Sequence, residues 1–399
     1  MTTLEIRNAR GLDGAPVDVR VEHGRIAALA PSLPGEVSGA GGGVRQIDAG
    51  GALLLPGLVE SHTHLDKTVW GMPWYVNACG ARLIDRIDNE RQWRAESAHD
   101  AGVASLALAR AFLAAGTTRL RTHVDIDTDA GLRHLDGVLG TRDALANTLD
   151  MQIVAFPQSG VLERAGTAAL LDDALARGAD VLGWLDPCAI DRDPKASLDA
   201  MFALADKHGC PVDIHLHEPG EMGIFSLELM LERIAALGMQ GKVVVSHAFC
   251  LGELDAARTE AWLARLADAG VALITTAPPS RIVPPLMACR RAGVALAGGN
   301  DGIRDTWTPY GSPDMLERAM MIGLRYNLRR DDELEIALNC VTYQGARVCG
   351  FDDYGLQVGA RADLVLVDAV NAAQAIVTRA PRRWVVANGH LVVSEGVAV

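Results

Sequence analysis

The 399-residue chain lacks an excess of positive charge, and this absence excludes one class of partner. Its 37 lysines and arginines are outnumbered by 50 aspartates and glutamates, which gives a formal net charge of -13. Proteins that bind nucleic acid present a basic surface to the phosphates. We therefore expect no nucleic-acid partner.

The sequence also lacks the apolar segments that direct a chain into or across a membrane. No run of about eighteen apolar residues is present, so we expect no transmembrane helix and no membrane partner. The first residues, 1–5, show no charged region followed by an apolar one, and so no secretory signal peptide. Seven cysteines are scattered without C-x-x-C pairs. This odd number predicts reduced thiols in a cytoplasmic protein.

One zinc signature is present only in half. Pro187-Cys188 begins the P-C-x-x-C sequence of the zinc nucleobase deaminases with the small deaminase fold. Asp191 stands where the second cysteine is required, so that fold is excluded.

Apolar strand-like runs alternate with longer helical stretches from residue 50 to about residue 357. The eight strand candidates are 53–62, 118–125, 151–158, 181–185, 212–215, 243–247, 271–275 and 294–301. This alternation predicts an α/β fold of the (β/α)8 TIM-barrel type. The alternative, a doubly wound open sheet, is disfavoured because no glycine-rich phosphate-binding sequence follows an early strand.

Both ends of the chain have a β-like texture and predict a second domain. Residues 1–54 are short alternating segments broken by Gly and Pro, with a flexible glycine-rich connection at 38–43, and residues 358–399 return to this texture. We expect a small β-sandwich built from residues 1–54 and 358–399, and the barrel at residues 55–357.

A long loop is expected between residues 66 and 98, and it contains Trp70, Trp74, Tyr75 and Trp93. Beside a barrel site such a loop would form a wall or lid. The alternative is a hydrophobic patch at a contact between subunits.

The pair His62 and His64 follows the apolar run 52–55 and the turn Pro56-Gly57. Side chains two apart in a strand point to the same face, so the two imidazoles lie side by side. Such a pair can chelate a divalent metal, although a satisfied surface or core pair is the alternative.

Barrel active sites form at the carboxyl ends of the strands, and polar side chains stand at most of these ends. They are Asp125 after the second strand, Gln158 after the third, Asp186 after the fourth, His215 and Glu218 after the fifth, His247 after the sixth and Asp301 after the eighth. So many imidazole and carboxylate groups favour a metal site. Histidine and carboxylate ligands without thiolate suit Zn2+, Fe2+ or Mn2+.

This order of residues resembles the amidohydrolase superfamily, with His-x-His on the first strand, His on the fifth and sixth, and Asp on the eighth. The local sequences are similar to its cytosine-deaminase branch. They are His-Thr-His-Leu-Asp at 62–66, Arg-Thr-His-Val-Asp at 121–125, Ala-Phe-Pro-Gln at 155–158, His215 with Glu218, Ser-His at 246–247, and Asp301 followed by Trp-x-Pro at 307–309. The resemblance covers essentially the whole chain, including the split β-sandwich.

The resemblance implies that His62, His64, His215 and Asp301 bind one divalent metal, for which the family allows zinc or iron. It also implies that His247 hydrogen-bonds the metal's water or the developing tetrahedral centre. Many relatives with two metals carry a carboxylated lysine after the fourth strand, where this chain has 185–187, Leu-Asp-Pro. Others carry a glutamate where this chain has Gln158. One metal is therefore expected.

The chemistry of these side chains supports the same site. A bound divalent metal lowers the pKa of its water from about 15.7 towards about 7, and Asp301 can accept the proton as hydroxide attacks. Glu218 is placed to protonate a ring nitrogen and to help the amine leave; its alternative is a loop carboxylate facing solvent. The Gln158 amide suits the amide edge of a pyrimidine-like ring, although it could cap the backbone instead.

Four further residues carry weaker expectations. Trp307 forms an apolar wall against a flat ring or is a buried structural residue. Lys67 reaches the pocket or braces the strand end with Asp66. His123 orients the site or is a core histidine with a hydrogen bond, and the second interpretation is favoured. His217 touches substrate only if the strand continues regularly to that point.

Two positions depart from the cytosine-deaminase pattern. Gly302 stands where the bacterial enzymes carry a second aspartate that faces the substrate, so we expect a wider pocket with one polar contact fewer. Lys67 also differs from those enzymes, whereas related aminotriazine hydrolases do show it. Both changes leave the reaction type intact and the substrate open.

We predict a metal-dependent aminohydrolase that hydrolyses the exocyclic C-N bond of a cyclic amidine by a metal-bound hydroxide with release of ammonia. Cytosine or a substituted cytosine is the first candidate substrate. An N-alkylaminotriazine aminohydrolase of the N-isopropylammelide type is the second prediction, and a ring-opening cyclic amidohydrolase the third. From another class, a catalytically silent metal-bound barrel could act as an interaction partner. The only expected partner of the enzyme is a small heterocyclic substrate, and the oligomeric state is open, a homo-oligomer included.

Overall fold

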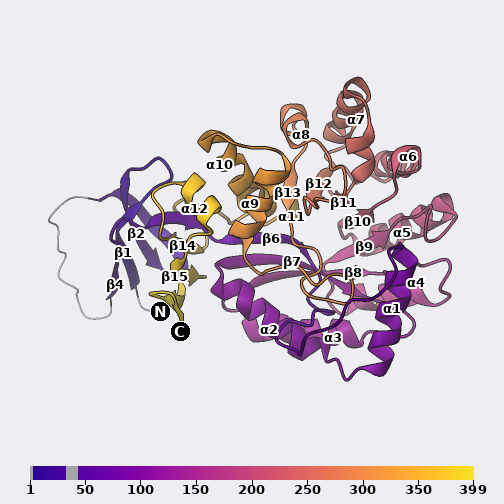
Figure 1. The fold of residues 1–399 in the computed structure, drawn as a ribbon, viewed down its shortest axis with the longest axis horizontal. Helices are drawn as coiled ribbons and strands as arrows, with labels where there is room; N and C mark the ends of the chain where they lie inside the picture. Colours follow the sequence, from indigo (N-terminus) through magenta and orange to yellow (C-terminus); the bar gives the residue numbers. More distant parts are fainter. Residues whose placement is uncertain (1–2, 33–43) are drawn as a thin grey trace.

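Eight parallel strands form a barrel with helices on its outside (Figure 1). The structure is a computed structural model that describes residues 3–32 and 44–399. The strands follow one another in chain order: β6 (Leu58–Thr63), β7 (Thr117–Asp125), β8 (Asp150–Phe156), β9 (Val181–Leu185), β10 (Val212–Leu216), β11 (Val243–His247), β12 (Ala272–Thr275) and β13 (Leu296–Gly298). A parallel bridge between Thr63 and Asp301 joins the first strand to the segment after the last. The predicted TIM barrel is confirmed.

Helices connect the barrel strands and cover them. Between successive strands lie α2 (Ala101–Ala114), α3 (Arg133–Leu145), α4 (Thr167–Ala176), α5 (Pro194–His208), α6 (Gly220–Leu237), the 3-10 turn η1 (Phe249–Glu253), α7 (Ala256–Asp268) and α8 (Leu286–Ala292). After the last strand follow α9 (Met315–Arg325), α10 (Asp331–Cys340) and α11 (Tyr343–Cys349). Within residues 3–32 and 44–399, no helix combines the length and apolar character that a membrane span requires.

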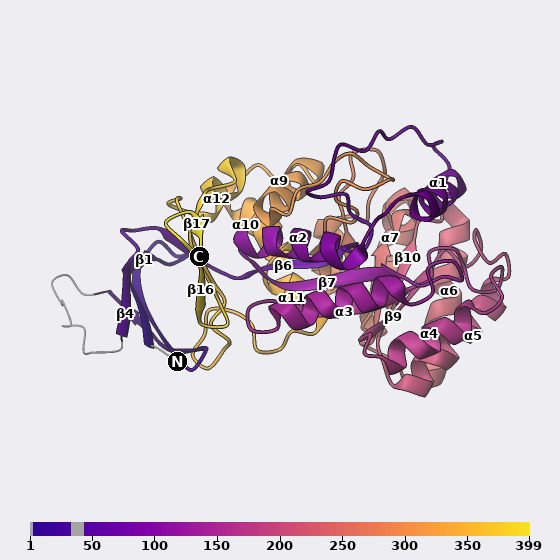
Figure 2. The same cartoon turned by 90° about the horizontal axis from the view of Figure 1, so that it is seen from below.

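The second sheet is built from both ends of the chain, which lie together at one end of the molecule (Figures 1 and 2). Its strands are β1 (Thr3–Arg10), β2 (Pro16–Glu22), β3 (Arg25–Pro31), β4 (Val44–Asp48), β5 (Leu53–Pro56), β14 (Leu364–Val367), β15 (Arg382–Ala387), β16 (His390–Ser394) and β17 (Val397–Ala398), with α12 (Ala372–Thr378) after β14. The strand β5 lies between β1 and β14 and joins the two halves. The predicted combination of a barrel with a terminal β-sandwich is confirmed. The glycine-rich tract expected at 38–43 lies outside the described residues.

The apolar run at 53–62, expected to be one barrel strand, is two strands in different sheets. β5 pairs with β14 in the terminal sheet, and β6 pairs with β7 in the barrel. Gly57 separates them, and a Cβ there would lie 2.1 Å from Thr118 Oγ1 and 2.9 Å from Asp363 Cβ. The chain therefore needs glycine at the place where it passes from one sheet to the other. The run is continuously apolar because both faces of each strand are buried.

The segment expected as a long loop at 66–98 contains a helix, α1 (Leu83–Glu96). Figure 2 shows α1 apart from the helices that alternate with the strands. Its sequence is largely polar, and only Ile87 and Glu90 of this helix are buried. A helix with so narrow an apolar face has little of the 3.6-residue periodicity by which helices are recognised in a sequence.

Candidate active site

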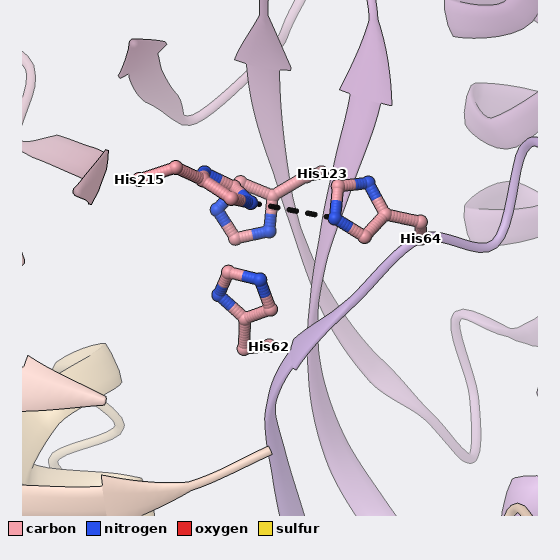
Figure 3. Close-up of side chains that lie close together, drawn as sticks. All are labelled: His62, His64, His123 and His215. Carbon is pink, nitrogen blue, oxygen red and sulfur yellow. Dashed lines mark hydrogen bonds between the residues drawn. The ribbon is translucent and has the colours of Figure 1, made fainter. Parts of the chain in front are cut away.

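Four histidines converge at the carboxyl end of the barrel (Figure 3). His62 lies in β6 and His64 directly after it, His123 lies in β7, and His215 lies in β10. All four side chains are buried, and one ring nitrogen from each lies within 4.8 Å of the others. The strand ends therefore deliver four imidazoles to one small volume.

Asp301 joins this histidine cluster from the segment after β13. Its Oδ1 lies 3.3 Å from His64 Nε2 and 3.8 Å from His62 Nε2. His64 Nε2 lies 3.4 Å from His215 Nε2, the contact dashed in Figure 3. The four residues predicted as metal ligands thus lie together. His247, at the end of β11, is next to them, with its Nε2 3.9 Å from Asp301 Oδ2.

The backbone places Asp301 and His247 in an unusual conformation. Their φ angles are +66° and +71°, in the left-handed region that residues with a Cβ rarely adopt. The Asp301 amide donates to the His62 carbonyl at 2.7 Å, and Thr63 Oγ1 donates to the Asp301 carbonyl at 3.0 Å. Such strain costs about 1–3 kcal/mol per residue and is characteristic of functional sites. The bonds to β6 hold Asp301 at the cluster in spite of this cost.

A chain of hydrogen bonds fixes the proton on His62. Ser246 Oγ donates to Asp213 Oδ1 at 2.7 Å, and Arg121 donates to the other oxygen of Asp213 at 2.9 Å. The Ser246 hydroxyl has a single proton, so His62 Nδ1, 2.9 Å away, must be the donor of their bond. His62 Nε2 then carries the lone pair that faces the cluster. Burial works against ionisation of Asp213, but His123 and Arg121 hold its pKa below the usual range.

Four histidines at the site, His62, His64, His215 and His247, are held neutral. Burial is the main cause, with charge repulsion from neighbouring groups, and it lowers the pKa of His64 to about 4 and that of His247 to about 3. Burial likewise places the pKa values of His62 and His215 well below their usual range. For Asp301, burial opposes ionisation, but the bond from His64 and nearby histidines keep its pKa well below normal. At neutral pH the cluster therefore offers imidazole lone pairs and one carboxylate.

These side chains fit a divalent metal. The ring atoms His62 Nε2 and both nitrogens of His123 and His247 are buried without a hydrogen-bond partner. Buried polar atoms without partners are costly. A cation that accepts nitrogen and oxygen ligands satisfies them, and zinc or iron(II) takes this donor set.

Glu218 lies after β10 with a buried carboxylate. Its Oε1 accepts hydrogen bonds from the amides of Cys188 and Ala189 at 2.7 and 2.9 Å, and its Oε2 accepts from Ser226 Oγ at 2.5 Å. Burial, followed by the charge of Asp186, raises its pKa. The expected alternative, a solvent-facing loop carboxylate, is wrong because the side chain is 2% exposed.

The three predicted substrate contacts lie side by side and form the polar wall of the site. Lys67 Nζ donates to Gln158 Oε1 at 2.5 Å and lies 4.7 Å from the centre of the Trp307 ring. Gln158 Nε2 is buried without a partner. Glu90, from α1, lies 3.5 Å from Lys67 Nζ and accepts the indole proton of Trp307. Lys67, Glu90, Gln158 and Trp307 are called the polar wall below.

Asp66 braces the end of the first strand, as one interpretation expected, but through partners other than Lys67. Its Oδ2 accepts from the Asp125 amide at 3.0 Å and pairs with His134 Nδ1 at 2.8 Å. Asp66 therefore ties the end of β6 to the end of β7 and to α3. Lys67 is left to the polar wall.

The expectation that Gly302 widens the pocket is wrong. A Cβ at Gly302 would lie 2.0 Å from Asp305 Oδ2, so the carboxylate of Asp305 occupies the place of the missing side chain. Asp305 is buried and accepts hydrogen bonds from the amides of Trp307 and Thr308 at 2.8 and 2.9 Å. Burial raises its pKa to about 7. The sequence signal was a second aspartate, Asp305, three residues after the glycine.

His217 and His123 both face the site. His217 Nδ1 bonds to Asp186 Oδ2 at 2.8 Å, and its ring stacks on His247 with 4.4 Å between centres. Burial opposes its protonation, but Asp186 raises its pKa. His123, favoured as a core histidine, has its Nε2 3.6 Å from Asp213 Oδ1 and its ring 4.2 Å from that of His62.

Sequence reasoning missed Glu60 and Glu90. Glu60 accepts the His62 amide at 2.9 Å and both the amide and the side chain of Asn300, and so it joins the ends of β6 and β13. Its position two residues before His62 in a buried strand was a signal, because a charge there must have a partner. Glu90 gave no such signal, since a glutamate in a polar helix is ordinary.

Comparison with known proteins places this geometry in context. The sequence model of the amidohydrolase family matches residues 45–399. The N-isopropylammelide isopropyl amidohydrolase of Pseudomonas sp. (strain ADP) is 30% identical, over 99% of this chain and 98% of that protein.

Two solved structures are similar over almost all of both chains. The N-isopropylammelide isopropylaminohydrolase of Burkholderia multivorans is 61% identical with a TM-score of 0.96, over 100% of both chains. The 5-methylcytosine deaminase of Klebsiella pneumoniae, bound to phosphonocytosine, is 27% identical with a TM-score of 0.85, over 99% of both chains.

Proposed function

We propose that this chain, which belongs to the amidohydrolase family, removes the alkylamino group of an N-alkylaminotriazine of the N-isopropylammelide type. Family membership makes it an amidohydrolase-type hydrolase that acts on C-N bonds. The observation that carries the finer proposal is the whole-chain likeness to the Burkholderia enzyme, at an identity twice that of the cytosine deaminase. The resemblance to the family is thereby confirmed.

The order of the two candidate substrates changes. The sequence alone placed cytosine first and the aminotriazine second, whereas the comparisons support the aminotriazine at least as well. Lys67 agrees, because it is the residue in which the sequence resembles aminotriazine hydrolases rather than cytosine deaminases. A cytosine-like substrate remains the second candidate, supported by the likeness to the Klebsiella enzyme.

We assign the metal ligands to His62, His64, His215 and Asp301. When bound, the divalent metal supplies a Lewis acid and lowers the pKa of a water molecule towards neutrality. The role of the protein is to keep the three imidazoles neutral by burial and to orient His62 through Ser246. His123 is close enough to be an alternative metal ligand, because one of its ring nitrogens lies within 4.8 Å of a ring nitrogen of His62, His64 and His215.

Two carboxyl groups with opposite pKa shifts, Asp301 and Glu218, carry out different proton transfers. Asp301 is ionised and accepts the proton of the attacking water. Glu218, whose pKa is raised by burial, holds a proton to higher pH and donates it to the ring nitrogen beside the reacting carbon. His247 Nε2, without a hydrogen-bond partner, is available to the oxygen that adds to the ring.

The reaction balances without a further reactant. Water adds to the ring carbon that carries the alkylamino group, the exocyclic C-N bond breaks, and the amine leaves with one proton of the water. The product ring carries oxygen at that carbon. We place the ring against the polar wall, with Gln158 Nε2 and Lys67 as its hydrogen-bond donors and the flat side of the Trp307 ring as its apolar contact.

The experiment is turnover of N-isopropylammelide and cytosine by the metal-loaded protein, with isopropylamine and ammonia as separate readouts. We expect kcat/KM for the triazine to exceed that for cytosine by at least about a hundredfold. The reverse ranking would reject the triazine in favour of cytosine. Substrate loss without release of amine would indicate ring opening, and no turnover of either compound would reject both candidate substrates.

A further inference from the structure

Glu90 is a buried charge on an otherwise polar and exposed helix. Within α1 it shares the buried face only with Ile87, and its side chain is 0% exposed. A buried carboxylate costs several kcal/mol unless it is paired and hydrogen-bonded. The buried carboxylate of Glu90 therefore requires partners that pair with it and donate hydrogen bonds to it.

Those partners are members of the polar wall. Glu90 Oε2 lies 3.5 Å from Lys67 Nζ, and the same oxygen accepts the Nε1 proton of Trp307. Lys67 in turn lies over the Trp307 ring and donates to Gln158 Oε1. One carboxylate from α1 thus fixes, directly or through Lys67, all three side chains predicted to contact substrate.

The position of Lys67 decides which end of the Gln158 amide is left without a partner. With Oε1 held by the ammonium group, the Nε2 protons are the ones left without a partner. The wall then presents donors only, from Gln158 and from Lys67. A ring edge that carries carbonyl oxygens supplies the matching acceptors.

Glu90 also balances the charge of the wall. Burial would lower the pKa of Lys67, but Glu90 first, then Asp305, Asp66 and Asp125, keep it protonated. The other nearby cation, Arg94, lies 3.9 Å from Glu90 Oε1 but gives its protons to Asp125 and Asp127. Lys67 therefore acts as a hydrogen-bond donor whose charge is already compensated.

We propose that Glu90 is a positioning residue that makes the site select neutral, carbonyl-bearing rings over anionic ones. It does so by orienting Lys67, Gln158 and Trp307 and by compensating the charge of Lys67. The inference deepens the proposed function and rests on it for the position of the ring against the polar wall.

The test compares Glu90→Gln with Glu96→Gln, the same substitution on the same helix. Glu96 is exposed and bonds to Gln92 at 2.9 Å. The probes are N-isopropylammelide for turnover, and uracil and barbiturate, a neutral and an anionic six-membered ring with carbonyl groups, for binding to the metal-loaded protein by calorimetry. Metal content and circular dichroism show whether each variant is folded.

For Glu90→Gln we expect KM to rise about tenfold while kcat changes less than about threefold, because the ring loses its donors and the reacting groups do not move. We also expect the Kd of barbiturate to fall at least about fivefold relative to that of uracil, because Lys67 loses the largest of the negative charges that compensate it. Glu96→Gln should change neither. Glu90→Asp keeps the charge and shortens the reach, so it should raise KM without changing the ratio of the two Kd values.

Several results would overturn the proposal. One is a Glu90→Gln protein with the KM and Kd ratio of Glu96→Gln. Another is an equal change of the Kd ratio in Glu90→Gln and Glu90→Asp, which would show an effect of shape rather than charge. If Glu90→Gln does not fold, an unchanged KM in Glu90→Asp decides against it. If the unmodified protein turns over no N-isopropylammelide, only the proposed function is rejected, because the binding of uracil and barbiturate still tests the role of Glu90. If it binds neither ring, the proposed function and the role of Glu90 are both rejected.

Discussion

Ser246 gives a clear case of one hydroxyl group that sets the chemistry of its neighbour. Because its proton goes to Asp213, it can only accept from His62, and His62 Nε2 is left to face the cluster. Without this bond, His62 could carry its proton on either nitrogen, and one of the two tautomers cannot bind a metal. The serine is therefore as much a part of the site as the histidine.

We predict that Ser246→Ala lowers metal affinity about 10- to 100-fold, the usual effect of removing a group that orients a ligand. Competition with a chelator at neutral pH measures it. Ser105→Ala is the control, since Ser105 is also buried but bonds to Thr141, 2.7 Å away and between α2 and α3. Equal metal affinity in both variants would show that the hydroxyl does not orient His62.

At the scale of elements, α1 is attached to the barrel by ion pairs and by Ile87, which packs against Phe156 and Leu185. Arg94 donates to Asp125 Oδ2 at 2.6 Å and to Asp127 Oδ2 at 2.7 Å, and its side chain is 8% exposed. Arg91 pairs with Asp129 in the same loop. Burial raises the pKa of Asp125 to about 7 in spite of Arg94. An unpaired Asp125 would be costly, so the helix and the loop after β7 hold each other in place.

We predict that Arg94→Ala destabilises the protein by about 3–5 kcal/mol, the effect of leaving a buried partner unpaired. Chemical denaturation measures this loss, and limited trypsin digestion should show new cleavage within 82–98. Arg82→Ala is the control: Arg82 is 79% exposed and bonds to Asp85. Its removal should leave stability unchanged. An Arg94→Ala protein that resists trypsin and denaturant as well as Arg82→Ala would contradict this account of α1.

How far the sequence predicts an element depends on how apolar the element is. The barrel strands were visible because burial on both faces makes them continuous runs, as in 243–247. The break at Gly57 was not visible, because 53–56 and 58–63 are buried in two different sheets and look alike. α1 was not visible because its buried apolar contact is limited to Ile87, and the ion pairs that also attach it have no period in the sequence.

The residues of the site also fall into those that the sequence predicts and those that it does not. Histidines and carboxylates at strand ends were predictable because the barrel topology brings those ends together. Asp305 and Glu90 were not, because each reaches the site through a loop or helix whose path the sequence does not specify. The space beside Gly302 shows why. From the sequence, glycine at this position predicts an empty space, whereas the structure shows the carboxylate of Asp305 in it.

At the scale of the whole molecule, the buried histidines link stability to pH. The folded-state pKa of His247 is about 3, below its unfolded value of about 6.5. Between these values the unfolded chain binds a proton that the folded protein does not, so stability rises with pH across this window and falls as the solution becomes more acidic. At pH 5 the loss from His247 is about 2 kcal/mol.

We predict that the metal-free protein loses stability between pH 7.5 and pH 5, and that His247→Gln reduces this loss by about 2 kcal/mol. Urea denaturation at the two pH values measures it. The exposed His390 provides the control, and His390→Gln should keep the full dependence. Parallel pH profiles for His247→Gln and the unmodified protein would contradict the lowered pKa.

The position of β5 between β1 and β14 has a consequence for how the protein is made. As the chain leaves the ribosome, β5 can pair with β1 early, but its other edge waits for a strand encoded some 300 codons later. Until β14 arrives, Leu53–Pro56 is an apolar strand with an open edge, the kind of segment that aggregates. Translation that stops before β14 would therefore leave this edge of β5 exposed and prone to aggregation.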